Sequence, residues 1–352
     1  MVMNDARDYV EECAVESGEL RRALEKALRE NEGEMHHVVE LTRRASPYSS
    51  SYALEEMDVR LADGRALQLM FKNLSWQTML EDARNVKPKL IYDPLREIET
   101  YRKILALRHL GNPHFYGAHV DHERGCYWLF IERVTGRKMR HVGEFEIWLE
   151  VARWLARMHT LFADAPEKLR ETQPHLLSYD ADFYRLWMGR ARALLRQEES
   201  SGASVALENL NRLAERYERV VEHLASLPQT FVHGDFFASN VLIEESGAMR
   251  RVCPVDWEMA GIGTGLIDLA ALTAGSWSER ERTELASAYY DALSPRGRWP
   301  PSMDEFVFAL DCCRLHIAVQ LLGWAAKWSP PLDEAQDWLG EAQRLAKILN
   351  LN

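Results

Sequence analysis

The chain has 352 residues, of which 47% are hydrophobic and 28% charged, and its formal net charge is −11. These values are typical of a folded globular protein with room for two cores, and they exclude disordered and fibrous classes. The negative charge argues against a nucleic-acid or anionic-membrane partner, because both polyanions would repel the surface on average.

Cysteine usage and the N-terminus indicate the compartment. The cysteines are odd in number, scattered and without a Cys-x-x-Cys pair, which is typical of thiols used as small apolar residues in a reducing compartment. The first residues, "MVMNDARDYVEECAVESGEL", are acidic and lack the apolar core of a secretory signal, and we expect no apolar run of the roughly 18 residues that a spanning helix needs. We therefore expect a cytoplasmic protein, a monomer or homodimer, without a nucleic-acid or membrane partner.

The first part of the chain predicts a helix followed by strands. Residues 5–31 place Leu, Ala and Val at helical spacing and end at "NEGE", so they predict an N-terminal helical extension. Next, "LEEMDVRL" and "RALQLMFK" flank "ADG", the pattern of a β-hairpin. Leu67, Leu69 and Phe71 fall on one face of the second strand and Lys72 on the other, so Lys72 ends a strand.

The remaining elements divide the chain into two halves. "PLREIETYRKILALRHL" predicts a helix and "CYWLFIERV" a strand, followed by the turn-rich "TGRKMRHVG". From Phe145 onward the pattern is mainly helical, and "FVHGDFFASNVLIEESGAMRRVCPVDWE" interrupts it with two short strands. A small β-rich half is therefore joined near residues 132–143 to a larger helical half.

The two strands of the interruption hold three polar residues, Asp235, Asn240 and Asp256. Carboxylate and amide oxygens suit a hard cation such as Mg²⁺, which takes its other ligands from water and phosphate. A carboxylate that is not on the metal can orient a hydroxyl or accept its proton. Phosphoryl transfer from a nucleotide needs this set of groups, whereas any one of them alone would be read as a turn or cap residue.

The spacing resembles a known family. His233-Gly234-Asp235-x4-Asn240 resembles the catalytic loop of protein kinases with Gly in place of Arg, and it is similar to the His-Gly-Asp loop of the aminoglycoside phosphotransferase and choline kinase superfamily. "VDWE" stands where that family carries its metal-binding Asp, and "GIGTGLIDLA" is similar to the glycine-containing loop and helix start that follow it. The Asp-Phe-Gly and Ala-Pro-Glu signatures of protein kinases are absent from the part of the sequence that follows Asn240, where protein kinases carry them, and this disfavours a peptide substrate.

The resemblance implies a bilobal, protein-kinase-like α+β fold. A small antiparallel β-sheet N-lobe over residues 36–134 would bind the nucleotide. A mainly helical C-lobe over residues 135–352 would carry the catalytic loop and the acceptor site. The helical extension of residues 1–35 would cover the nucleotide loop, form a dimer contact or pack on the small lobe.

The family comparison implies a role for each polar residue of the loop region. Asp235 would be the catalytic base or would orient the acceptor hydroxyl, and Asn240 and Asp256 would bind Mg²⁺. His233 would brace the loop by hydrogen bonds, and Asp268 would tie the loop to the helix that follows it.

The resemblance also implies nucleotide-binding residues upstream. Lys72 would hold the α- and β-phosphates. Without the downstream loop, the same residue would be interpreted as a solvated lysine at the end of a strand. Glu97, or alternatively Glu99, would position Lys72. The strand that ends at Glu132 stands where backbone groups would contact the adenine.

The loop "RRASPYSSSY" stands where protein kinases carry a glycine-rich phosphate loop, but it contains no glycine. The backbone amides and hydroxyls of Ser49, Ser50 and Ser51 can still donate to phosphate, so we expect these serines to contact the nucleotide.

The resemblance places the acceptor site in the helical lobe, near the catalytic loop and walled by later helices, and the helix "DCCRLHIAVQLLGWAAKW" offers two interpretations. Asp311 or the face of Trp324 or Trp328 would contact a polar or cationic acceptor. In the alternative interpretation Asp311 pairs with Arg314 three residues on, and the tryptophans pack in the core. His159, on an apolar helix face, is expected to be a structural histidine.

The sequence therefore predicts a small-molecule kinase. It would transfer the γ-phosphate of ATP, or GTP, with Mg²⁺, to a hydroxyl of an acceptor such as an aminoglycoside, amino alcohol or sugar. Two alternatives stay open: a nucleotide-binding pseudokinase that acts as a regulatory or interaction module, and a metal-dependent hydrolase that uses the same acids on water.

Overall fold

The computed structural model describes residues 15–48, 51–108, 110–197, 201–247, 249–275, 277–293, 302–324 and 337–351. The chain forms two compact units. The first unit comprises Met1–Gly136 and Glu244–Glu258, and the second comprises Arg137–Ile243 and Met259–Asn352. The break after Gly136 lies next to the predicted boundary at residue 134. The segment Glu244–Glu258, which the sequence placed in the helical half, groups with the first unit.

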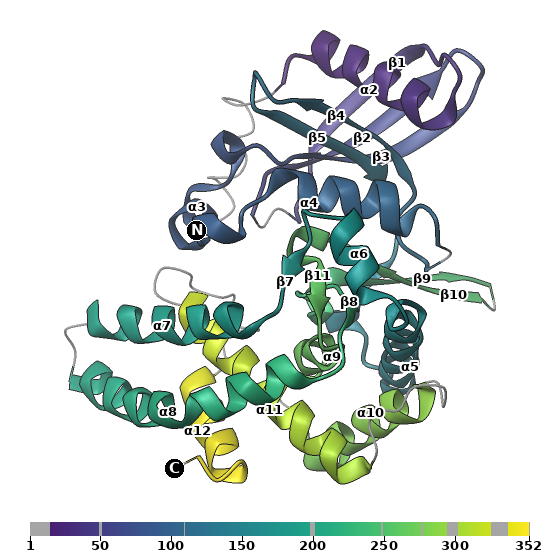
Figure 1. The fold of residues 1–352 in the computed structure, drawn as a ribbon. Coiled ribbons are helices and arrows are strands. Elements are labelled where there is room, and N and C mark those ends of the chain that lie inside the picture. Colours follow the sequence, from purple (N-terminus) through teal and green to yellow (C-terminus); the bar gives the residue numbers. More distant parts are fainter. Residues whose placement is uncertain are drawn as a thin grey trace. The chain divides into compact units, whose positions relative to one another are not determined.

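The first unit contains an antiparallel five-stranded sheet in the order β1-β2-β3-β5-β4 (Figure 1). Its strands are β1 (Val38–Ala45), β2 (Leu54–Leu61), β3 (Ala66–Asn73), β4 (Phe115–Asp121) and β5 (Cys126–Glu132). The predicted β2–β3 hairpin is confirmed, and Leu67, Leu69 and Phe71 are buried on one face of β3 as their alternation predicts.

Helix α2 (Ser17–Glu32) packs on this sheet (Figure 1). Its apolar face, with Leu20, Leu24 and Leu28 fully buried, joins the same core as β1, β2, β3 and β5. The helix approaches β4 closely at Gly117, whose φ is +141°. A Cβ atom there would lie 2.7 Å from the carbonyl oxygen of Ala27, so this position has no room for a side chain. Three roles were expected for the N-terminal extension. Its described part shows one of them, packing on the sheet of the small lobe.

The rest of the first unit connects β3 to β4 and contributes a hairpin. The connection contains η1 (Trp76–Thr78), α3 (Glu81–Val86), η2 (Lys89–Ile91), α4 (Pro94–Glu99) and η3 (Thr100–Leu105). The single helix predicted after residue 94 is thus an α-helix that continues into a π-helical turn. Strand β9 (Val241–Ser246) crosses the division between the units and leads to β10 (Met249–Pro254) and the turn η6 (Trp257–Met259).

The second unit is mainly helical, as predicted. Its helices are α5 (Phe145–Phe162), α6 (Pro166–Thr172), α7 (Ala181–Gln197), α8 (Ser201–Ser226), α9 (Leu266–Leu272), α10 (Glu279–Ala292), α11 (Met303–Trp324) and α12 (Trp338–Ile348). A small mixed sheet in the order β7-β11-β8 joins β7 (Leu177–Ser178), β11 (Gly261–Gly263) and β8 (Thr230–Val232). The short β6 (Arg137–Lys138), followed by η4 (Met139–His141), pairs with the start of β9, and the turn η5 (Ala238–Asn240) precedes β9.

Helix α11 corrects one expectation. In the described part of the chain it is the one helix long and apolar enough to cross a membrane by composition, whereas the sequence was expected to contain none. Most of this apolar stretch, 72% of it, is buried inside the protein. A helix surrounded by core is apolar all round, so α11 is a core helix.

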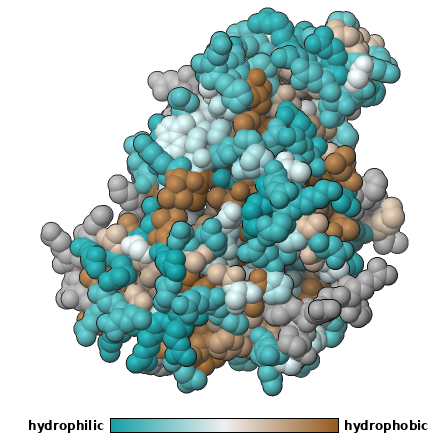
Figure 2. Space-filling view, viewed as in Figure 1, coloured by the Kyte–Doolittle hydropathy of each residue, from teal (hydrophilic) through white to brown (hydrophobic). Residues whose placement is uncertain are grey.

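The surface is largely hydrophilic in the view of Figure 2, with apolar areas between the polar ones. The exposed large apolar side chains of the described residues come from different elements, among them Met35, Leu107, Val205 and Met249. Scattered exposed apolar residues are normal on a globular protein.

Candidate active site

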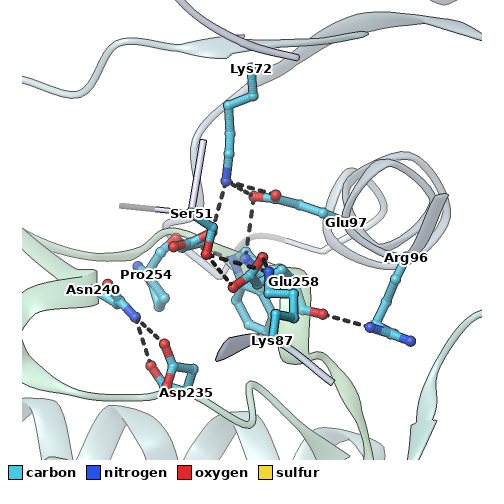
Figure 3. Close-up of polar contacts among 11 residues, drawn as sticks. Ser51, Lys72, Lys87, Arg96, Glu97, Asp235, Asn240, Pro254 and Glu258 are labelled. Atoms are coloured by element: carbon cyan, nitrogen blue, oxygen red, sulfur yellow. Dashed lines mark hydrogen bonds and ion pairs between the residues drawn. The ribbon is translucent and has the colours of Figure 1, made fainter. Parts of the chain in front are cut away.

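Lys72 lies between two carboxylates in the first unit. Its Nζ donates to Oε1 and Oε2 of Glu97 at 2.8 and 2.7 Å and to Oδ1 of Asp256 at 2.8 Å (Figure 3). Lys72 is 5% exposed and Glu97 1% exposed, so this is a buried ion cluster and not a solvated strand-end lysine. A strand, a helix and the segment after β10 each contribute one residue to it.

The charges of this cluster depend on one another. Burial by itself would lower the pKa of Lys72, but the negative charges of Asp256 and Glu97 outweigh that effect and raise the pKa above its usual value. Burial raises the pKa of Glu97 to about 7 against the opposing charge of Lys72. The ammonium group of Lys72 is therefore held in its charged form.

Local structure explains why Glu97 and not Glu99 pairs with Lys72. Asp93 caps α4 by accepting the N–H of Leu95, which begins the helix at Pro94. Glu99, two residues beyond Glu97, instead forms ion pairs with Arg102 and Lys103 on its own helical turn.

Asp256 adopts a left-handed backbone conformation, with φ of +67°. This region is unfavourable for residues other than glycine, although Asp tolerates it better than most. The next residue is firmly held: Trp257 is fully buried, its N–H donates to Oε1 of Glu97 at 3.3 Å, and its indole donates to the carbonyl of Pro254. The surrounding contacts therefore fix the backbone from which the carboxylate reaches Lys72.

A second buried lysine, Lys87, contacts Glu258, two residues after Asp256. Glu258 accepts from Nζ of Lys87 at 2.5 Å and from the hydroxyl of Ser51 at 3.0 Å (Figure 3). The backbone carbonyl of Glu258 accepts from Arg96 at 2.8 Å. Sequence reasoning identified Ser51 but missed Lys87, Arg96 and Glu258; the position of Glu258 two residues after Asp256 was the one available signal.

In the second unit, the loop after β8 orients Asp235 through Asn240. The Nδ2 group of Asn240 donates to the backbone carbonyl of Asp235 at 3.0 Å and to its Oδ2 at 2.7 Å (Figure 3). Their five-residue spacing closes this contact across a tight turn. It fixes the direction of the carboxylate.

Asp268, at the start of α9, holds the other end of the same loop. Its Oδ2 accepts the backbone N–H of His233 at 2.7 Å, and its Oδ1 accepts that of Gly234 at 2.8 Å. Nε2 of His159 lies 3.1 Å from Oδ2 of Asp268, and Nδ1 of His159 lies 2.8 Å from the hydroxyl of Tyr289. His159 thus has the structural place expected for it.

The glycine of the loop is required by its surroundings. Gly234 has φ of +80°, and a Cβ atom there would lie 1.8 Å from the hydroxyl of Tyr179 and 2.3 Å from the carbonyl of Met259. His233 is fully buried, and its Nδ1 accepts the N–H of Asp235 at 3.3 Å. Backbone and side chains together place the Asp235 carboxylate at the end of a rigid turn.

A phosphotransferase enzyme family model matches residues 95–306, more than half of the chain. The chain belongs to the phosphotransferase enzyme family. The matched range contains Glu97, Asp235, Asn240, Asp256 and Asp268, whereas Lys72 precedes it.

Solved structures share the protein-kinase-like fold of this phosphotransferase. A microcompartment-associated aminopropanol kinase is 17% identical with a TM-score of 0.56, covering 88% of this chain and 90% of that one. A gentamicin complex of APH(2")-IIa is 13% identical with a TM-score of 0.54, covering 96% and 97%. A putative aminoglycoside phosphotransferase from Ralstonia eutropha is 14% identical with a TM-score of 0.52, covering 94% and 96%. No curated protein gives a significant match.

The oxygen donors of the phosphotransferase fit a magnesium ion by their chemistry. Asn240 uses its Nδ2 for both bonds to Asp235, so its amide oxygen is the atom suited to a cation. Asp256 offers a carboxylate. The described residues contain no group of three or more His, Cys, Asp or Glu side chains that could hold a metal ion.

The remaining predicted residues have other partners. Glu132 forms an ion pair with Arg251 at 2.7 Å, and its N–H donates to the carbonyl of His114, so contact of this strand with adenine stays a prediction. Ser49 and Ser50 lie outside the described residues.

The expected acceptor residues show the contacts of the alternative interpretation. Asp311 pairs with Arg314 at 3.0 Å. Trp324 packs on Trp187 with ring centroids 4.9 Å apart, and Trp328 lies outside the described residues. An acceptor role for Asp311 and Trp324 stays a prediction.

Proposed function

We propose that the protein transfers the γ-phosphate of ATP or GTP to a hydroxyl group of a small molecule in a Mg²⁺-dependent reaction. The observation that carries the proposal is the buried Lys72, held at 2.7 to 2.8 Å by both Glu97 and Asp256. A charged lysine kept in place by two carboxylates is suited to nucleotide phosphates.

The first unit would bind the nucleotide phosphates. Lys72 would donate to the α- and β-phosphates, and Glu97 would keep its ammonium group in position. Asp256, together with Asn240, would hold Mg²⁺, which when bound supplies positive charge to the phosphate oxygens. Because the three N–H groups of Lys72 are donated to Glu97 and Asp256, the contact with Asp256 would give way to the phosphates and Mg²⁺, while Glu97 keeps the ammonium group in position.

The second unit would supply the group that acts on the acceptor. Asp235 would orient the acceptor hydroxyl and accept its proton as the oxygen bonds to the γ-phosphorus and the bond to the β-phosphate breaks. The products would be a phosphate monoester and a nucleoside diphosphate. Asn240 supports this role because its bond to Oδ2 of Asp235 holds the carboxylate in one orientation.

The acceptor class is proposed from the relatives and the charge. The matched solved structures include an aminopropanol kinase and a gentamicin complex, both of which concern amine-bearing hydroxyl compounds. The net charge of −11 is compatible with a cationic substrate. We propose an amino alcohol, aminoglycoside or related sugar, and a cytoplasmic location that fits the free thiols of Cys126, Cys253, Cys312 and Cys313.

Calorimetric titration with ATP and with GTP, with and without Mg²⁺, tests the proposal. Wild type should bind a nucleotide more tightly with Mg²⁺, and Asp256→Ala should lose that enhancement. Failure of wild type to bind either nucleotide would exclude the proposal.

A second measurement separates the alternatives. Asp235→Asn should bind nucleotide like wild type but show no acceptor phosphorylation in a screen of amino alcohols and aminoglycosides. Nucleotide binding without turnover of any acceptor by wild type would favour a pseudokinase. ATP turnover that acceptors do not increase would favour a hydrolase.

A further inference from the structure

The loop after β1 lacks the glycines that usually let a backbone approach phosphates, yet its end is held by several contacts. The hydroxyl of Ser51 donates to Oε1 of Glu258 at 3.0 Å. The carbonyl of Ser51 accepts the N–H of Leu80 at 3.0 Å. Both the side chain and the backbone of this serine are therefore fixed.

The next residue is fixed as well. Tyr52 is 4% exposed and forms an isolated β-bridge with Met79. The Nζ atom of Lys87 lies 5.3 Å from the centre of the Tyr52 ring, within the range of a cation–π contact. Lys87 thus touches both residues at the end of the loop, since its Nζ also lies 3.4 Å from the hydroxyl of Ser51.

Lys87 connects this loop to the segment of Asp256. It follows α3 as its C-terminal cap, and its Nζ donates to Oε2 of Glu258 at 2.5 Å. The side chains of Lys87 and Glu258 are 5% and 18% exposed, so the pair is largely shielded from water. The carboxylate of Glu258 therefore accepts hydrogen bonds from both Ser51, at the end of the loop, and the buried ammonium group of Lys87.

We propose that Lys87 is a positioning residue that holds Ser51 and Tyr52, at the end of the loop after β1, in place for the nucleotide phosphates. It does so by directing the Glu258 carboxylate at Ser51 and by packing on Tyr52. The inference rests on the proposed function, because that function gives the loop its nucleotide.

A positioning role and a merely structural role predict different results. If Lys87 only stabilises the fold, its removal lowers the melting temperature and leaves nucleotide affinity unchanged. If it positions the loop, its removal weakens nucleotide binding through lost preorganisation, even when stability is restored by other means.

The test measures MgATP affinity by calorimetry and melting temperature for Lys87→Met, Lys87→Arg and the double variant Lys87→Met/Glu258→Gln. The control is Lys89→Met, an exposed lysine two residues on that lies over Trp76. We expect Lys87→Met to weaken MgATP binding about 10- to 100-fold. Lys87→Arg should recover most of that loss, because it keeps the positive charge. The control should bind MgATP like wild type.

The double variant decides the matter. Removing both charges should restore the melting temperature relative to Lys87→Met, because no buried charge is left unpaired. Affinity should stay low, since the ammonium group of Lys87 no longer contacts Ser51 and Tyr52. Wild-type affinity in Lys87→Met, or recovery of affinity together with stability in the double variant, would overturn the inference. Absence of nucleotide binding in wild type would instead overturn the proposed function.

Discussion

The carboxylate of Asp268 accepts the backbone N–H of Gly234 at 2.8 Å, although the two residues lie 34 positions apart in the chain. The same carboxylate accepts the N–H of His233 and lies 3.1 Å from His159. Helix α9 and the loop after β8 are therefore joined by one fully buried side chain.

Asp268→Ala should strongly destabilise the second unit. It leaves two buried N–H groups and a histidine without their acceptor, at a cost of about 1–3 kcal/mol for each unsatisfied group. We expect a loss of about 3–5 kcal/mol in the free energy of unfolding, measured with urea. Asp291→Ala, at an exposed position on α10, is the matched control and should change stability by less than about 0.5 kcal/mol.

Gly234→Ala should destabilise the protein and abolish activity. The added methyl group would meet the Tyr179 hydroxyl and the Met259 carbonyl, and alanine disfavours a φ of +80°. Strain and overpacking together should cost about 2–5 kcal/mol. Gly189→Ala, where no atom lies within 4 Å of the added Cβ on the exposed side of α7, should be neutral or slightly stabilising. Equal thermal stability of the two variants would contradict this account.

Lys72→Met should lower kcat/KM for the nucleotide by at least about 100-fold, because the proposed function needs the fixed charge of Lys72 at the α- and β-phosphates. The comparison is Lys103→Met, which removes a half-exposed lysine whose partner, Glu99, also pairs with Arg102. Steady-state kinetics with any accepted substrate measures both. Similar kcat/KM values for the two variants would contradict a role of Lys72 in nucleotide binding.

Acidification should destabilise the second unit through His316. Burial lowers the pKa of His316 to about 3, and this outweighs the opposing effect of the Gln320 side chain, which favours the charged form. Since the folded pKa lies below the unfolded value of 6.5, the stabilising effect is complete above pH 6.5 and is lost as pH falls toward 3. His316 should therefore account for about 2 kcal/mol of lost stability between pH 6.5 and pH 5.

Urea unfolding at these two pH values checks the expectation. His316→Gln has no titrating ring, so its stability should fall less over the same range, even though it loses the contact of Nδ1 with the Tyr217 hydroxyl at 2.8 Å. Parallel pH dependence in wild type and variant would assign the acid sensitivity to other groups.

The sequence predicted most of the architecture and the loop around Asp235, because hydrophobic periodicity and a short motif are local properties. It also left Glu97 and Glu99 as the two candidates beside Lys72, and the structure resolved that choice. The contact between Lys87 and Glu258 could not be predicted, since it joins residues 171 positions apart and neither residue belongs to a periodic pattern. The apolar character of α11 was underestimated because Asp311, Arg314 and His316 interrupt it in the sequence, whereas burial makes it a core helix.

The close approach of Ala27 to Gly117 has a consequence for cooperativity. Because α2 shares one apolar core with Leu69, Trp128 and Phe130, the helix and the sheet should unfold together as a single foldon. The amide hydrogens of Leu24 and Leu28 should then exchange with solvent as slowly as those of β3. A shortened chain that begins after Glu32 would expose the sheet face that α2 covers and would be prone to aggregate.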